Sequence, residues 1–174
     1  QQNCSPNMES FVLLARAYPR SLPGPIGSVT EQLLRDASTV PGYGPSQILY
    51  NLVLEAYARD SKHDSSAPIE CQRIIWEMEQ KCDKGYNIGP SPTSSGHLAL
   101  AYARSESLES MRAIPQLLQK GKLPSMPIVQ KIVSELCTTR EGMLIVEECV
   151  SLLKEMNITS GEHIERSLLN GWSK

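Results

Sequence analysis

The strongest constraint in the sequence is an internal repeat, in which a proline precedes a small polar residue. This dipeptide recurs at intervals of 39, 45 and 34 residues, as Pro6-Asn7, Pro45-Ser46, Pro90-Ser91 and Pro124-Ser125. Periods of this length are typical of helical-repeat architectures, in which each repeat is one supersecondary unit that buries its apolar face against its neighbours. The sequence therefore predicts successive helix pairs that stack into a curved array.

Each dipeptide is followed, at a constant distance, by a mostly apolar set of residues spaced i, i+3, i+4 and i+7. This spacing marks one face of an α-helix. The four sets are Phe11, Leu14, Ala15 and Tyr18; Tyr50, Val53, Leu54 and Tyr57; Ser95, Leu98, Ala99 and Tyr102; and Val129, Ile132, Val133 and Leu136. A partial fifth copy, Leu168, Leu169 and Trp172, closes the sequence. Each repeat is therefore predicted to begin with an amphipathic helix.

A second helix is predicted in every repeat, and in the first copy it spans residues 26–37. The predicted buried faces of the second helices are Leu33 and Leu34; Cys71, Ile74, Ile75, Met78 and Cys82; Leu108, Met111, Ile114 and Leu118; and Val146, Cys149, Val150 and Leu153. Pro115 interrupts the third of these, and a proline should kink that helix or delay its start. The extra residues of the first two copies, 19–25 and 60–67, predict surface loops between helices.

These patterns predict an all-α fold in a single domain that covers residues 1–174. The domain contains about four and a half helix-turn-helix repeats. Their predicted limits are 7–45, 46–90, 91–124, 125–159 and a partial copy at 160–174.

Composition argues against several classes of function. The net charge is −2, whereas proteins with strong nonspecific affinity for nucleic acid are usually basic. No apolar run approaches the roughly 18 residues of a membrane span, so no membrane partner is expected. The five cysteines include no C-x-x-C pair, which fits neither a disulfide framework nor a zinc site. Cys71, Cys82 and Cys149 are predicted to be small core residues.

The sequence carries no recognisable catalytic constellation. Both glycine-rich phosphate-binding motifs are absent, and no nucleophile is paired with a positioned base. His63, His97 and His163 lie in different repeats without the spacing of metal ligands, and the acidic pairs Glu77/Glu79 and Glu147/Glu148 are predicted to be solvated. We therefore expect no enzymatic activity, no cofactor, no metal and no small-molecule substrate.

Several of these repeats resemble the pentatricopeptide-repeat family. Tyr50-Asn51 with Tyr57 fits the opening of that family's first helix, and residues 76–78 (WEM) and 152–156 (LLKEM) fit its second. Residues 121–125 (GKLPS) fit the end of the repeat. The tetratricopeptide alternative lacks its expected Trp and its fixed small residues. The resemblance covers almost the whole chain, although the first copy is degenerate, and it implies a right-handed α-solenoid.

The resemblance also implies single-stranded RNA binding, with roughly one base read per repeat. The family's two base-reading positions fall here on Val12 with Ser46, Asn51 with Ser91, Gly96 with Ser125, and Gln130 with a residue near Ser160. Asn51 with Ser91 is the pair that offers hydrogen bonds to a base, with a preference for pyrimidines. An alternative is that Asn51 satisfies backbone groups, and that Ser46, Ser91 and Ser125 are helix-start residues.

A basic residue lies two positions beyond the aromatic residue that ends the first-helix pattern. The resemblance implies that these residues, Arg20, Arg59, Arg104 and Lys174, contact phosphates. A stripe of such cations would give modest, salt-sensitive affinity for RNA. The alternative is that each cation only favours the negative end of a helix dipole.

Two functions follow from the resemblance. The first is an RNA-binding protein of a mitochondrion or plastid that acts in transcript processing, splicing, stability or translation. The second is a non-catalytic protein-interaction scaffold, such as a subunit or assembly factor of a mitochondrial ribosome or another organellar ribonucleoprotein. A further alternative is that the chain is a fragment whose catalytic domain lies elsewhere.

Overall fold

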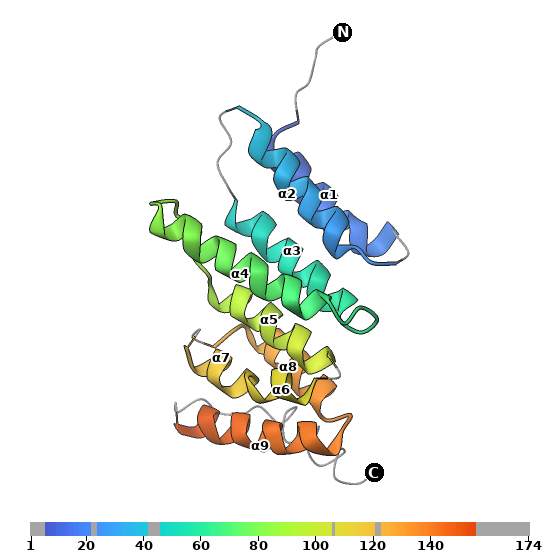
Figure 1. Ribbon diagram of the computed structural model, residues 1–174, viewed down its shortest axis with the longest axis vertical. Helices are drawn as coiled ribbons and strands as arrows, with labels where there is room; N and C mark the ends of the chain where they lie inside the picture. Colours follow the sequence, from blue (N-terminus) through green and yellow to red (C-terminus); the bar gives the residue numbers. More distant parts are fainter. Residues whose placement is uncertain (1–5, 22–23, 42–45, 106, 121–122, 156–174) are drawn as a thin grey trace. The chain divides into compact units, whose positions relative to one another are not determined.

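The computed structural model describes residues 6–21, 24–41, 46–105, 107–120 and 123–155, without the side chains of residues 20 and 21. Over these residues the chain forms nine helices and no strand, which confirms the all-α prediction (Figure 1). The chain divides into two compact units, residues 1–89 and 90–174. The partial fifth copy lies outside the described residues.

Unit 1 consists of two helix pairs, as the repeat pattern predicts. The first pair is α1 (Met8–Ser21) with α2 (Gly27–Thr39), and the second is α3 (Gln47–Asp60) with α4 (Ala67–Asp83). Helix α3 packs against α1, α2 and α4, so it is the central helix of the unit. Helix α1 continues through Pro19 to Ser21, which the sequence assigned to a loop.

Unit 2 also consists of two helix pairs, one of them interrupted. Its helices are α5 (Pro92–Arg104), α6 (Leu108–Arg112), α7 (Ile114–Lys120), α8 (Met126–Leu136) and α9 (Arg140–Glu155). Helix α5 packs against α7 and α8, and α9 packs against α7 and α8. Pro115 lies in the first turn of α7, where its missing N–H costs no hydrogen bond, so the predicted interruption is confirmed.

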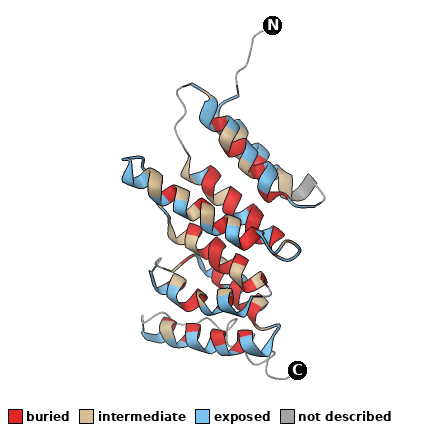
Figure 2. Cartoon of the chain, in the orientation of Figure 1, coloured by how far each residue is buried: buried red, intermediate tan, exposed pale blue. Residues whose placement is uncertain are grey.

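The predicted helix faces form the core of each unit (Figure 2). All four residues of the predicted faces on α3, α8 and α9 are buried. On α1, by contrast, only Ala15 of the predicted face is buried, and Leu14 is 44% exposed. The predicted faces therefore match the buried faces of α3, α8 and α9, whereas α1 buries its predicted face least.

Two residues of the predicted second-helix faces are exposed. Cys71 and Cys149 are buried as predicted, and burial raises the pKa of the Cys149 thiol to about 12. The prediction for Cys82 is wrong, because it lies in the last turn of α4, beyond Met78, the last buried residue of that helix. Leu108 is also exposed, since it opens the short helix α6.

Candidate nucleic-acid interface

The four first-helix candidates for base reading lie on equivalent positions of α1, α3, α5 and α8. Val12 and Asn51 are partly exposed, Gln130 is exposed, and Gly96 is buried. Each follows directly on the residue that opens the predicted face. Three of the four positions therefore retain surface that a ligand could reach.

Gly96 has a packing role in unit 2. A Cβ atom at this position would lie 2.6 Å from the Cβ of Pro124 and 2.9 Å from the Cγ2 of Ile128. The absence of a side chain therefore allows the start of α8 to approach α5 closely. This requirement accounts for a glycine at a position where the family's pattern has a base-reading side chain.

The serines at the second base-reading position begin helices. The Ser46 hydroxyl accepts a hydrogen bond of 3.4 Å from the Leu49 N–H, at the start of α3. Ser91 and Ser94 form a capping box at the start of α5, each hydroxyl accepting from the other's N–H. The helix-start interpretation is confirmed for Ser46 and Ser91. Ser125 precedes α8 and is exposed, and its hydroxyl makes no capping hydrogen bond.

The phosphate candidates within the described residues contact the neighbouring first helix. Arg59 on α3 is exposed, and its guanidinium donates to the carbonyl oxygen of Pro19 on α1. Arg104 on α5 pairs with Glu135 on α8, with 3.0 Å between Nε and Oε1 and side-chain exposures of 15% and 20%. Both arginines thus link adjacent first helices. The side chain of Arg20 and all of Lys174 lie outside the described residues.

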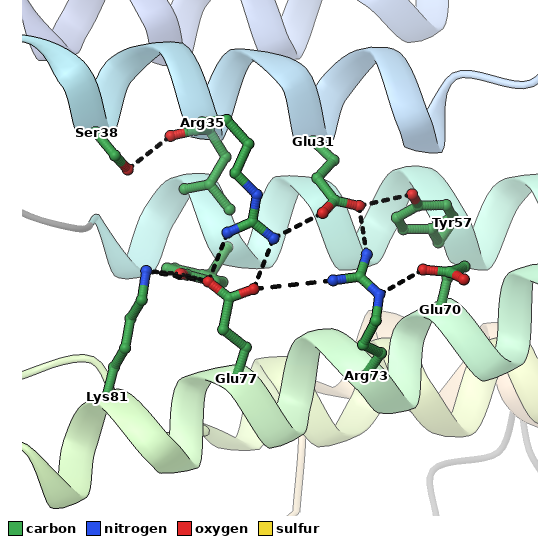
Figure 3. A network of polar contacts seen from close by, with 10 residues as sticks. Glu31, Arg35, Ser38, Tyr57, Glu70, Arg73, Glu77 and Lys81 are labelled. Atoms are coloured by element: carbon green, nitrogen blue, oxygen red, sulfur yellow. Dashed lines mark hydrogen bonds and ion pairs between the residues drawn. The ribbon is translucent and has the colours of Figure 1, made fainter.

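A polar network that the sequence analysis missed connects the two second helices of unit 1 across α3 (Figure 3). Arg35 on α2 donates through both terminal nitrogens to Glu77 on α4, at 2.6 Å each. In the other direction, Arg73 on α4 donates at 2.6 Å to Glu31 on α2. These crossed pairs join α2 to α4.

The same two glutamates also accept hydrogen bonds from tyrosines of the intervening helix α3. Tyr57 donates to Glu31 at 2.8 Å, and Tyr50 donates to Glu77 at 2.5 Å. Lys81, one turn beyond Glu77 on α4, approaches the Glu77 carboxylate to 3.0 Å. The network therefore includes side chains from all three helices. Its glutamates fix the positions of the hydroxyl groups of the two buried tyrosines.

The prediction that Glu77 is solvated is wrong, because its side chain is only 18% exposed. Burial by itself would raise the pKa of the Glu77 carboxyl. The hydrogen bonds from Arg35, Tyr50 and Lys81 outweigh burial and lower that pKa to about 2. Burial, together with the same carboxylate, raises the pKa of Tyr50. Glu79, Glu147 and Glu148 are exposed as predicted.

A second polar contact joins the start of α2 to the end of α3. The Asp60 carboxylate, at the last residue of α3, accepts from the N–H groups of Ile26 and Gly27 at 2.8 and 2.6 Å. These N–H groups begin α2, where the helix has no internal acceptors for them and where a negative charge is favoured. The sequence placed Asp60 in a surface loop, but its side chain is buried and positions a helix.

The sequence signal for the network was present but not decisive. Glu31 with Arg35 is an i, i+4 pair, and Glu70, Arg73, Glu77 and Lys81 repeat at three- and four-residue steps. Such alternation is equally typical of a solvated helix face. Only the packing of α2 and α4 on either side of α3 distinguishes the two cases.

The described residues contain no cluster of three or more His, Cys, Asp or Glu side chains that could hold a metal ion. Among the described helices, none combines the length and the apolar character needed to cross a membrane. No protein-family model, curated protein or solved structure shows a significant match to the chain.

Proposed function

We propose that the chain is a non-catalytic RNA-binding protein whose helix pairs are pentatricopeptide-type repeats of a right-handed α-solenoid. In this proposal it acts in a mitochondrion or plastid, on the processing, splicing, stability or translation of a transcript. The proposal rests on the repeat register, whose predicted faces are fully buried on α3, α8 and α9. It rests also on the residues that resemble the family.

The observation that carries RNA binding is the position of Asn51 on α3. Tyr50 is fully buried and Val53 is fully buried, so Asn51 lies at the edge of the buried face and remains partly exposed. This is the position at which the family reads a base, and an amide can both donate to and accept from a base edge. Gln130 offers the same chemistry on α8 and is exposed.

The charges of the described residues support a modest affinity. Arg104 pairs with Glu135, and Arg59 donates to a backbone carbonyl, so neither guanidinium is fully available to phosphates. Few phosphate contacts give a shallow dependence of affinity on salt. We therefore expect recognition to depend more on base contacts than on the backbone of the RNA.

The second candidate is a protein-interaction scaffold in an organellar ribonucleoprotein. A specific observation favours it: of the family's base-reading positions, Ser46 and Ser91 cap helices and Gly96 is buried. These residues have structural roles that explain them without RNA. The two candidates differ in whether Asn51 contributes to RNA affinity.

The test is binding of the chain to a random single-stranded RNA pool at low and at physiological salt. Asn51→Ala should lose the enrichment of particular sequences, whereas Glu55→Ala, an exposed position on the same helix, should keep it. Arg59→Glu probes phosphate contact. Arg104→Glu with Glu135→Arg reverses the second cation while it preserves the ion pair that joins α5 to α8.

Each outcome distinguishes the candidates. Enrichment that is lost in Asn51→Ala establishes base reading. Binding that is lost only in the charge variants indicates contact with the RNA backbone alone. An absence of binding at low salt overturns the RNA proposal and leaves the scaffold.

A further inference from the structure

One face of α1 is exposed and largely apolar, whereas the equivalent face of α3 is buried. Aligned by the repeat, Ser10, Leu14 and Ala17 of α1 correspond to Leu49, Val53 and Ala56 of α3. The three α3 residues are at most 2% exposed, whereas the three α1 residues are exposed, Leu14 to 44%. Leu13 beside them is 59% exposed. We call Ser10, Leu13, Leu14 and Ala17 the outer face of α1.

The residues that continue this stripe on α3, or lie beside it, contact α2, which packs against α3. Leu49, Val53 and Ala56 continue at the same helical spacing to Asp60, whose carboxylate binds the start of α2. Tyr57 beside them bonds Glu31 of α2. The matching stripe of α3 therefore faces a helix of another helix pair, and a helix is the natural cover for the outer face of α1.

The charges on α1 indicate which helix fits. Glu9 and Arg16 are exposed and lie along one edge of the outer face, on opposite sides of Leu13. Along the helix axis they lie roughly 6 Å before and 4.5 Å after that residue. When two copies of α1 pack antiparallel about Leu13, Glu9 of each copy meets Arg16 of the other on the same edge. The face is thus complementary to itself.

We propose that this face binds a second copy of the chain, through an antiparallel pairing of two α1 helices related by a twofold axis. Leu13 and Leu14 of each copy pack at the centre, and the small residues Ser10 and Ala17 allow close approach of the helices. Two Glu9–Arg16 pairs fix the direction and register, as charged residues beside the apolar seam do in coiled coils. The area of one helix face limits the dimer to weak affinity.

The experiment measures the oligomeric state of the full 174-residue chain by sedimentation velocity, over about 10 to 500 µM, where small interfaces dissociate. We expect a concentration-dependent dimer that Leu13→Asp with Leu14→Asp abolishes. These side chains are exposed, so circular dichroism should show unchanged helix content. A monomer at all concentrations, or a dimer that persists in this variant, would overturn the proposal.

Charge variants test the antiparallel register and do not depend on the leucines. Glu9→Arg alone and Arg16→Glu alone each place two like charges together, and each should weaken the dimer about tenfold. An equal mixture of the two variants should form a heterodimer, because both ion pairs are then restored. The double variant Glu9→Arg with Arg16→Glu should regain the dimer of the original chain. Failure of the mixture and of the double variant to recover would overturn the pairing.

Discussion

The two units hold equivalent helix pairs together by different means. In unit 1 the second helices α2 and α4 are joined by arginine–glutamate pairs that also engage Tyr50 and Tyr57 of the helix between them. In unit 2 the second helices α7 and α9 pack directly against each other, and their buried residues are mostly apolar, including Ile114, Leu118, Val146 and Leu153. The ion pair Arg104–Glu135 of unit 2 joins first helices instead.

The difference shows that one repeat register can be stabilised by a polar layer or by an apolar one. An apolar contact tolerates small shifts, because dispersion and burial have no strict geometry. A partly buried network of charges is stable only while every member has its partner. Unit 1 should therefore respond sharply to single changes in charge, and unit 2 should not.

The largest expected effect comes from Glu77→Ala. This change leaves Arg35, Tyr50 and Lys81 without their shared acceptor, and we expect a loss of about 3 kcal/mol of unfolding free energy. The matched change in unit 2, Glu135→Ala, should cost about 1 kcal/mol, since it removes the acceptor of one cation, Arg104, instead of an acceptor that three groups share. Urea unfolding, with hydrogen exchange to assign each unit, measures both. Equal losses would contradict the contrast between the units.

Acid should affect the same network. The folded pKa of Glu77, about 2, lies below the 4.5 of an unperturbed Glu, so its contribution is complete above about pH 4.5 and declines toward pH 2. At pH 3 about 2 kcal/mol should be lost. The pKa of Glu31 is also lowered, mainly by hydrogen bonds from Arg35, Tyr57 and Arg73 against the effect of burial, which adds to the trend. Urea unfolding at pH 7, 4 and 3 measures it, and Glu77→Gln should flatten the curve. An unchanged slope in that variant would remove Glu77 from the explanation.

A smaller effect is expected where glycine permits close packing. A Cβ at Gly27 would lie 2.3 Å from a ring carbon of Tyr57, and one at Gly96 would lie 2.6 Å from Pro124. Gly27→Ala and Gly96→Ala should each cost about 1 to 2 kcal/mol, after the better helix propensity of Ala is included. Thermal unfolding measures the loss, with Ser28→Ala as the exposed control on α2.

A double-mutant cycle identifies the cause of the glycine effect in unit 1. Tyr57→Leu removes the ring that Gly27 contacts, so Gly27→Ala should cost less in that background. Equal costs in both backgrounds would show that the ring is not the obstacle.

Much of the fold was predictable because its signals are local. The spacing of Tyr50, Val53 and Tyr57 identifies a helix face without knowledge of what covers it. Pro115 likewise predicts an interruption from its own covalent structure. The candidate site was less predictable: Ser91 could begin a helix or read a base, and both roles require the same hydroxyl in the same place.

The charged residues Glu77 and Asp60 were predicted wrongly from the sequence. Glu77 and Glu79 are two residues apart on one helix, yet the first lies within the network and the second lies in solvent. Asp60 follows a helical stretch and precedes a polar segment, which is the sequence of an ordinary loop. Its partners, the N–H groups of Ile26 and Gly27, precede it by more than thirty residues.

The sequence by itself determined the helix pairs of the described copies and most of their buried faces, because periodicity and proline act within one or two turns. Only the tertiary structure decided what the polar and small residues on those faces do. A glutamate becomes part of a network, and a glycine becomes necessary, only when a particular neighbour lies within hydrogen-bond or van der Waals distance. The Tyr57 ring of α3 lies against Gly27 of α2, and its hydroxyl donates to Glu31 of the same helix. No local sequence pattern specifies these contacts between helices.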